Sequence, residues 1–407
     1  MAQQATTANA NGPIWGGADN GADTTTDARR ALYLKLFSGE TFKGFQRNTI
    51  ARDLVTRRTL KNGRSLQFIY TGRTKAEFHV PGQSILGNDE KTPPVAEKTI
   101  QCDDLLISSA FVYELDETLA HYDLRGEISR KIGYALAENY DRRIFRAISK
   151  AARQPAPVNM TNFKEPGGSI VKVGAANSTA ATDAYDSTKL ITAFYEAAAI
   201  LDEKGVSGDG RVAVLNPRQY YELIQNVGTN GLINRDAQGS ALQSGNGIIE
   251  IAGITIYKSM NIPFLGDYGV NLANLPAGAV SNINEAGSKG SFIGEDMDDQ
   301  DAATTPSGQK TVNNYGTAAK FGGSCGLIFQ KEAAGVVEAI GPQVQVTSGD
   351  VSAVYQGDVI LGRLAMGADY LNPAAAVELV AGIDVSANWD NTAVSVSYTH
   401  LTLPTKA

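Results

Sequence analysis

Apolar residues recur every four positions between Glu117 and Arg153, where no proline interrupts the chain. The recurring residues are Leu124, Ile128, Ile132, Leu136, Tyr140, Ile144 and Ile148. This period places them along one side of an α-helix, whereas the side chains of a strand alternate with a period of two. The pattern therefore predicts one long helix over 117–153, which we call the spine helix, ended by Pro155 and Pro157.

The apolar stripe of the spine helix is expected to need more than one partner. A strict step of four gains about 40° per repeat over an ideal helical turn, so the stripe winds around the helix. We therefore expect different elements to bury its two ends. The second half also carries five cations, Arg142, Arg143, Arg146, Lys150 and Arg153. Phosphate binding is one interpretation of these cations, and pairing with acidic neighbours or another subunit is the favoured one.

The chain before the spine helix divides into three segments. Residues 1–28 hold almost no apolar side chains and are predicted to be a disordered tail. Residues 29–64 carry apolar side chains too scattered to close a core, and we interpret them as an N-terminal arm along a larger surface. Residues 65–113 contain two strand patterns, at 66–70 and 105–113, separated by a turn-rich stretch. They predict a two-stranded flap, an extended loop that needs a supporting surface.

The chain after the spine helix has a mixed helix and strand pattern. We expect a peripheral domain over 114–206, with a second helix from Ser187 to Lys204 whose apolar face packs against the spine helix. Residues 207–344 predict an axial α+β domain, and residues 345–380 a return to the peripheral domain. Residues 381–407 are interpreted as a C-terminal tail, of which Ser397–Ala407 differ in composition and are treated as a candidate foreign segment.

Composition limits the classes of function. The 407 residues have a formal net charge of −7 and a hydrophobic content of 43%, enough for a sizeable core. An acidic chain is not drawn to nucleic acid, because phosphate binding needs a surplus of Lys and Arg. Cys102 and Cys325 lie in unrelated contexts and are predicted to be buried thiols in a reducing compartment. We expect neither a transmembrane helix nor a signal peptide.

Candidate catalytic residues are few. Of the three histidines, His121 lies at the start of the predicted spine helix, where packing or capping is favoured over catalysis. Ser324 lies in Gly-Gly-Ser-Cys-Gly, which matches the nucleophile elbow G-x-S-x-G, but a Gly-rich loop precedes it and a strand pattern follows. A turn is therefore favoured over a serine hydrolase.

Metal and nucleotide sites have weak support. The acidic cluster Glu295, Asp296, Asp298, Asp299 and Asp301 departs from a calcium-binding EF-hand loop at its sixth and twelfth positions, so a solvated loop within 265–320 is favoured. The sequence has no phosphate-binding P-loop, no dinucleotide-binding glycine motif and no paired-cysteine zinc spacing. We expect no cofactor, no metal and no enzymatic activity.

Several motifs, in a fixed order, resemble the major capsid protein of short-tailed, podovirus-type (autographivirus-type) tailed phages. They are Ala31–Glu40, Gly72–Ala76, Leu115–Glu117 with His121–Arg125, Gly326–Phe329 with Ala334–Val337, Leu364–Ala368 and Asn372–Ala376. The resemblance covers about residues 30–380. It implies the Hong Kong 97-type capsid fold, an α+β fold with an N-arm, an extended β-hairpin loop, a peripheral domain holding the spine helix, and an axial domain.

The resemblance also implies a function and partners. Copies of the chain are expected to form hexamers and pentamers of an icosahedral head that encloses double-stranded DNA without specific binding, with a scaffolding protein and a portal as partners. The expected location is the virion, after synthesis in the host bacterial cytoplasm, without any membrane association. The flap residues Arg73, Lys75, Glu77, Asp89, Glu90 and Lys91 are candidates for salt bridges between subunits. The alternatives are an encapsulin-like compartment shell and a hydrolase that uses Ser324.

Overall fold

The computed structural model describes residues 50–382, apart from 75, 77, 83–92, 120–123, 158–164, 176, 226–248, 263, 265–312, 314, 316–320 and 348–355. The predicted tail at 1–28, most of the predicted arm, His121, the acidic cluster and the C-terminal tail beyond 382 lie outside the described residues. The chain forms two compact units. The described part of the first comprises 105–140 and 339–366, and that of the second comprises 50–104, 141–338 and 367–382.

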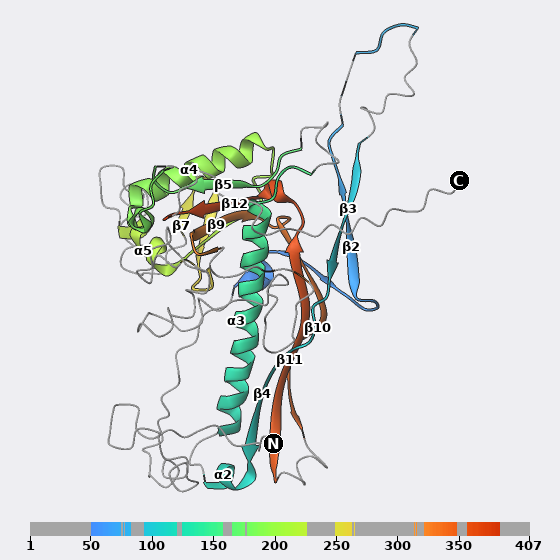
Figure 1. Cartoon of the computed structure of the whole chain (residues 1–407), viewed down its shortest axis with the longest axis vertical. Coiled ribbons are helices and arrows are strands. Elements are labelled where there is room, and N and C mark those ends of the chain that lie inside the picture. The colour runs from blue at the N-terminus through green and yellow to red at the C-terminus, as the bar shows by residue number, and fades with distance from the viewer. Residues whose placement is uncertain are drawn as a thin grey trace. The chain divides into compact units, whose positions relative to one another are not determined.

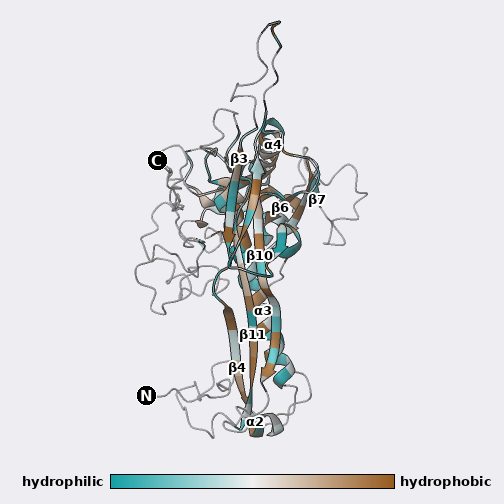
Figure 2. Cartoon of the chain, turned by 90° about the vertical axis from the view of Figure 1, so that its right-hand side faces the viewer, coloured by the Kyte–Doolittle hydropathy of each residue, from teal (hydrophilic) through white to brown (hydrophobic). Residues whose placement is uncertain are grey.

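The first unit places the first part of a long helix against two antiparallel strands. Strand β4 (Leu106–Tyr113) pairs with β11 (Gly357–Tyr370), with Leu106 opposite Leu364. Helix α2 (Glu114–Leu119) follows β4, and α3 (Leu124–Ala152) begins after it. Ile128 and Ile132 of α3 pack with Val112 of β4 and Ile360 of β11, and Figure 2 shows the apolar character of both strands.

The second unit contains a six-stranded sheet with the order β5-β12-β9-β6-β8-β7. Its strands are β5 (Ser169–Lys172), β6 (Arg211–Leu215), β7 (Ile249–Ile251), β8 (Ile254–Lys258), β9 (Ser324–Gln330) and β12 (Ala376–Val380). Strand β6 pairs in parallel with β8 and antiparallel with β9, and β12 pairs in parallel with β5. The sheet therefore joins segments that are distant in sequence (Figure 1).

Two helices pack on this sheet. Helix α4 (Ser187–Glu203) begins after Asp186, whose carboxylate accepts hydrogen bonds from the backbone of Thr188 and Lys189, and Gly205 follows it with φ +71°. Helix α5 (Pro217–Gln225) follows β6. Helix α4 was predicted correctly, but its expected partner was wrong. Its apolar face packs with α5, β5 and β12 in a core that contains no α3 residue (Figure 1).

Smaller elements complete the described chain. Short 3-10 helices occur at η1 (Ala51–Asp53), η4 (Ala181–Tyr185) and η8 (Pro373–Ala375). Strand β1 (Thr56–Thr59) pairs in parallel with β10 (Ala334–Thr347), within a four-stranded sheet of order β1-β10-β11-β4. This pairing accounts for the end of the predicted arm, which lies along a larger surface of its own chain. Strands β2 (Ser65–Thr71) and β3 (Val95–Gln101) form a separate antiparallel hairpin.

Two sequence predictions need correction. The spine helix is confirmed as α3, but it begins at Leu124, and the preceding residues 117–119 belong to α2. The flap is confirmed as a two-stranded hairpin, but its second strand is β3 and not the segment 105–113, which forms β4 and pairs with β11. Sequence analysis missed β3 because its residues are mostly polar, and an apolar run close by gave the stronger strand pattern. The predicted domain boundaries stay predictions.

We predict that Gly367→Ala lowers the free energy of unfolding by about 1–3 kcal/mol, because a Cβ at Gly367 of β11 would overlap the carbonyl oxygen of Gln101. The matched control is Gly341→Ala in β10, where no atom lies within 4 Å of the added carbon. Both changes restrict the unfolded chain equally, so their difference in urea unfolding reports the overlap. Equal stabilities of the two variants would contradict the described packing of β11.

Candidate functional site

The β2–β3 hairpin is the candidate functional surface because its strands pair only with each other. One face, with Tyr70 and Ile100, turns toward the rest of the second unit, and Ile100 is fully buried. The opposite face leaves Ile69 76% exposed and Val95 65% exposed. At these exposed fractions, neither Ile69 nor Val95 is covered by another described residue. This face therefore has the character of a contact surface.

The connecting loop between the two strands, residues 72–94, has two further exposed apolar side chains in its described part. Phe78 and Val80 in its described part are both exposed.

Of the six flap residues predicted to form salt bridges between subunits, only Arg73 lies within the described residues. The other five are Lys75, Glu77, Asp89, Glu90 and Lys91. Their role between subunits stays a prediction.

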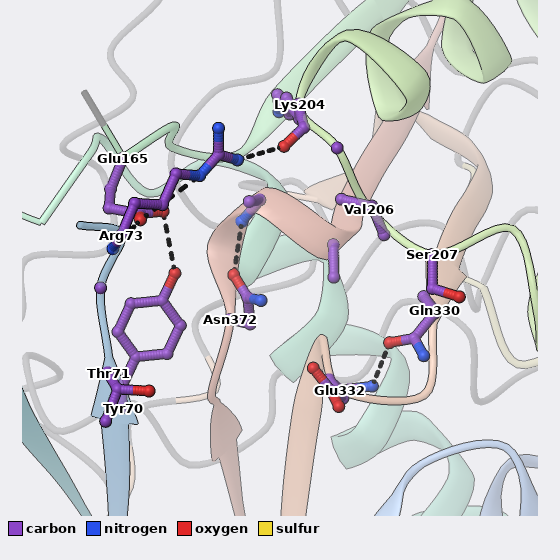
Figure 3. Close-up of a pocket in the computed structure, with 14 residues that line it drawn as sticks. Tyr70, Thr71, Arg73, Glu165, Lys204, Val206, Ser207, Gln330, Glu332 and Asn372 are labelled. Atoms are coloured by element: carbon purple, nitrogen blue, oxygen red, sulfur yellow. Dashed lines mark hydrogen bonds and ion pairs between the residues drawn. The ribbon is translucent and has the colours of Figure 1, made fainter. Parts of the chain in front are cut away.

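Arg73 is held by its own chain at the start of this loop. Its backbone N–H donates to Oε1 of Glu165 at 2.8 Å, and its guanidinium Nε lies 3.4 Å from the same oxygen. Its Nη2 donates to the backbone carbonyl of Lys204 at the end of α4. The hydroxyl of Tyr70 donates to Oε2 of Glu165 at 3.2 Å (Figure 3). One carboxylate therefore collects three contacts from the end of β2.

A polar cavity of about 270 Å³ lies beside these contacts. Its lining includes Tyr70, Glu165, Lys204 and Glu332 (Figure 3). Burial, reinforced by the carboxylate of Glu165, raises the pKa of Tyr70 to about 12. Burial also lowers the pKa of Lys204 to about 8, and its ammonium donates to the carbonyl of Gly167 at 2.7 Å. Burial therefore disfavours charge on both side chains.

The second part of α3 is the other unusual feature of this unit. Every residue from Tyr140 to Arg153 is buried. A helix buried on all sides is normally apolar all round, but this one contains six charged side chains. They are Asp141, Arg142, Arg143, Arg146, Lys150 and Arg153.

Three of these cations pair with buried carboxylates. Arg153 donates from Nε and Nη2 to both oxygens of Glu378 in β12, at 2.6 and 2.7 Å. Lys150 lies 2.9 Å from Asp369 in β11, whose second oxygen lies 2.7 Å from Lys98 of β3. Pairing with acidic neighbours, the favoured interpretation, is therefore confirmed for three of the five basic residues.

The third pair belongs to a four-donor cluster around Asp103. Arg143 lies 3.3 Å from its carboxylate, the hydroxyl of Tyr315 donates at 2.6 Å, and Asn313 donates from its backbone and its side chain at 3.0 Å each. Burial raises the pKa of Asp103, although each of these donors favours the ionised form. The cluster joins the residues before β4 to the segment that leads to β9.

Aromatic rings complete the surroundings of the cations. The guanidinium of Arg143 lies 5.0 Å from the ring centre of Tyr315, and that of Arg153 lies 4.6 Å from Phe321. Lys98 lies 3.8 Å from the ring centre of Tyr370. A cation above an aromatic ring gains electrostatic attraction that partly replaces lost hydration.

Sequence analysis identified the cations of α3 but missed Glu165 and the acidic partners. The detectable signal was Glu378, a carboxylate within the apolar run Ala-Val-Glu-Leu-Val, because a charge in a buried strand requires a partner. Asp103 and Glu165 lie in polar stretches, and nothing local distinguishes them from solvated carboxylates.

The residues considered for chemistry are placed for packing. The turn predicted at Ser324 is wrong, because Ser324 is the first residue of strand β9. The residue is fully buried, so it is not the exposed serine of a nucleophile elbow. Cys102 and Cys325 are buried thiols, as predicted. Within the described residues, no group of His, Cys, Asp and Glu side chains is arranged to hold a metal ion. No helix in that part of the chain is long and apolar enough to cross a membrane.

Comparison with known proteins identifies the family. The sequence profile of the Gp10A-like major capsid protein family matches residues 67–380, more than half of the chain. The chain belongs to this major capsid protein family. The capsid structure of Cyanophage P-SCSP1u has a TM-score of 0.64 and 31% sequence identity, and the match covers 86% of this chain and 94% of that one. The prediction of a Hong Kong 97-type capsid fold is therefore confirmed.

Relatives in coliphages are capsid proteins as well. The major capsid protein of Escherichia phage T7 is 29% identical over 48% of this capsid protein, and the chain spans about half of the length of that relative, at 56%. The minor capsid protein of Enterobacteria phage T3 is 25% identical over 95% of the chain and 82% of the T3 protein. Capsid proteins are structural components of the virion, so the prediction that this chain is not an enzyme is confirmed. The encapsulin-like and hydrolase alternatives are not favoured.

We predict that Arg153→Met destabilises the unassembled capsid protein by about 3–5 kcal/mol, because Glu378 would remain buried without its bidentate partner. The double variant Arg153→Met, Glu378→Leu should recover most of this loss. Arg130→Met, which breaks an exposed pair with Glu127, serves as the control and should cost at most about 0.5 kcal/mol. Urea unfolding measures all three, and a double variant as unstable as the single one would contradict the assignment.

Asp369 should make stability depend on pH. Burial by itself would raise its pKa, but Lys150 and Lys98 outweigh burial and hold the pKa below its ordinary value of 3.8. A lowered folded-state pKa stabilises the fold above the ordinary value, and this contribution is lost as the pH falls below it. The stability difference between the parent and Asp369→Asn should therefore shrink from about pH 5 to about pH 3.

The control for this pH dependence is Asp104→Asn, which removes an exposed carboxylate near Arg64. Its stability difference from the parent should stay nearly constant over the same range, because the Asp104 side chain is 76% exposed in the folded chain. A constant difference for Asp369→Asn would show that Lys98 and Lys150 do not stabilise the ionised form.

Proposed function

We propose that this capsid protein assembles with copies of itself into hexamers and pentamers of an icosahedral phage head that encloses double-stranded DNA. The observation that carries the proposal is the β2–β3 hairpin, which exposes Ile69 and Val95 on one face. An isolated hairpin gains little stability from its own pairing, and a second copy of the chain would cover this face. The capsid names of its relatives support the same conclusion.

Many modest contacts suffice for such a shell. A subunit held by several neighbours gains from multivalency, because each further contact forms within an already tethered complex. Weak individual contacts also allow a misplaced subunit to dissociate. We propose that the six flap residues Arg73, Lys75, Glu77, Asp89, Glu90 and Lys91 supply salt bridges at these contacts, and Arg73 would do so with its half-exposed guanidinium.

The enclosed DNA would be confined without specific binding. The formal net charge is −7, and the cations of α3 are buried and engaged inside the fold. Phosphates would therefore find little attraction on this wall, which favours packaging and release.

A scaffolding protein and a portal are the partners we propose for assembly, after synthesis in the host bacterial cytoplasm. The domain organisation proposed from the sequence, with peripheral and axial domains, is retained.

We predict that Ile69→Asp abolishes shell formation, because a buried unpaired carboxylate at a subunit contact is strongly unfavourable. Ile69→Val keeps the apolar surface and serves as the control. Purified chains would be compared by negative-stain electron microscopy, with and without a scaffolding protein, and by circular dichroism. We expect shells from the parent and the control only, with equal helical content in all three. Closed shells from Ile69→Asp would contradict the proposed contact face.

A further inference from the structure

The chain passes from β2 into the connecting loop 72–94 at a point that side-chain contacts define. Strand β2 ends at Thr71, and Gly72 still pairs with the carbonyl of Pro94 at 2.8 Å. Arg73 then meets Glu165 through its backbone N–H and its guanidinium. The described residues that follow, from Thr74 to Gly82, are all exposed. Among the described residues of the loop after Gly72, Arg73 makes two contacts with the carboxylate of Glu165, which belongs to another segment.

Glu165 is itself held rigidly. It precedes Gly167 and Gly168, and a Cβ at either glycine would overlap backbone atoms at the end of α3. The N–H of Gly168 donates to the carbonyl of Gln154 at 2.8 Å. The turn is thus pressed against the end of α3, with no room for side chains at the two glycines. The carboxylate of Glu165, only 5% exposed, is presented from a fixed support.

The end of α4 closes the arrangement. Lys204 donates from its ammonium to the carbonyl of Gly167, and its own carbonyl accepts from the guanidinium of Arg73. Arg73 is therefore bound to two supports, the Glu165 turn and the end of α4, and these supports are bound to each other. Two attachment points on different elements restrict rotation of the chain, whereas a single hydrogen bond acts as a pivot. Figure 3 shows Tyr70, Arg73, Glu165 and Lys204 together around the cavity.

We propose that Glu165 is a positioning residue for assembly, which fixes the direction of the chain at residues 72–74, where the connecting loop begins. This inference rests on the proposed function, because direction matters only if the loop contacts another copy. A loop fixed in its contact direction avoids the entropy loss of ordering during association. A loop free to rotate would meet its neighbour in many wrong orientations, and assembly would slow.

The test compares Glu165→Ala with the matched control Glu332→Ala. Glu332 lines the same cavity, and its removal takes away the same charge without touching the contacts to Arg73. Glu165→Ala is expected to fold, because the guanidinium of Arg73 is half exposed and can be hydrated. Tyr70→Phe combined with Arg73→Met provides a second variant that removes the side-chain donors and keeps both Glu165 and the backbone N–H of residue 73.

Two measurements on the unassembled full chain report the loop direction. Hydrogen exchange follows the backbone amide of Arg73, which should exchange at least about tenfold faster in Glu165→Ala, because hydrogen bonds to a charged group are the strong ones. Spin labels on Thr74→Cys and Ala199→Cys should give a narrow distance distribution in the parent and in Glu332→Ala, and a broad one in Glu165→Ala. Shell formation by light scattering should then slow by about tenfold in Glu165→Ala and keep the parental rate in Glu332→Ala.

The outcomes separate this inference from the proposed function. An unchanged distance distribution in both Glu165→Ala and the Tyr70→Phe, Arg73→Met variant would overturn the positioning role. A broad distribution with assembly at the parental rate would show that loop direction does not limit assembly, which also overturns the inference. If the parent itself forms no shells under any condition, the proposed function fails, while the distance measurement still decides whether Glu165 holds the loop.

Discussion

The burial of paired charge along α3 is the constraint on which the second unit depends. Arg143, Lys150 and Arg153 lie at steps of seven and three, so they share one side of the helix. Removing these cations from water is costly, and the cost is offset only where a carboxylate meets each one at short distance. Apolar packing tolerates sliding, because it has no direction. A bidentate pair such as Arg153 with Glu378 is directional and does not allow the helix to slide. These pairs therefore fix the rotation and register of the helix.

The same device joins distant parts of the sequence. Tyr315 and Asp103 are 212 positions apart, and Arg153 and Glu378 are 225 apart. Asp369 joins α3 to β3 because it pairs with Lys150 of α3 and Lys98 of β3. Closing such long chain separations costs conformational entropy, and buried charge-assisted contacts oppose that cost more strongly than neutral ones. The hairpin is thereby tied to the most firmly held helix of the unit.

This organisation suits a shell protein. The body uses its charges internally and leaves apolar residues such as Ile69 and Phe78 exposed on the hairpin and its loop. Such residues cannot be covered within the described chain, but a neighbouring copy offers a surface at no cost in chain entropy. In the proposed assembly the two parts have separate tasks, since the body fixes geometry and the hairpin makes contacts.

Local patterns in the sequence determined the elements whose partners are close along the chain. The period of four marked α3, Asp186 and Gly205 marked the ends of α4, and the turn at Ala252-Gly253, where both residues have positive φ, matched the β7–β8 hairpin. The ordered resemblance to capsid proteins then supplied the family. Of the candidate contact residues, the described structure places Arg73 alone.

Only the tertiary structure decided which distant segments meet. In the structure β2 pairs with β3, and β4 pairs with β11. The apolar face of α4 packs on the sheet and not on the spine helix, and carboxylates from distant segments pair with the cations. The physical reason is that periodicity reports which face of an element is apolar, but not which remote surface will cover it. A solvated Glu165 and a buried one have the same local sequence, so its contacts with Tyr70 and Arg73 became visible only once the chain was folded.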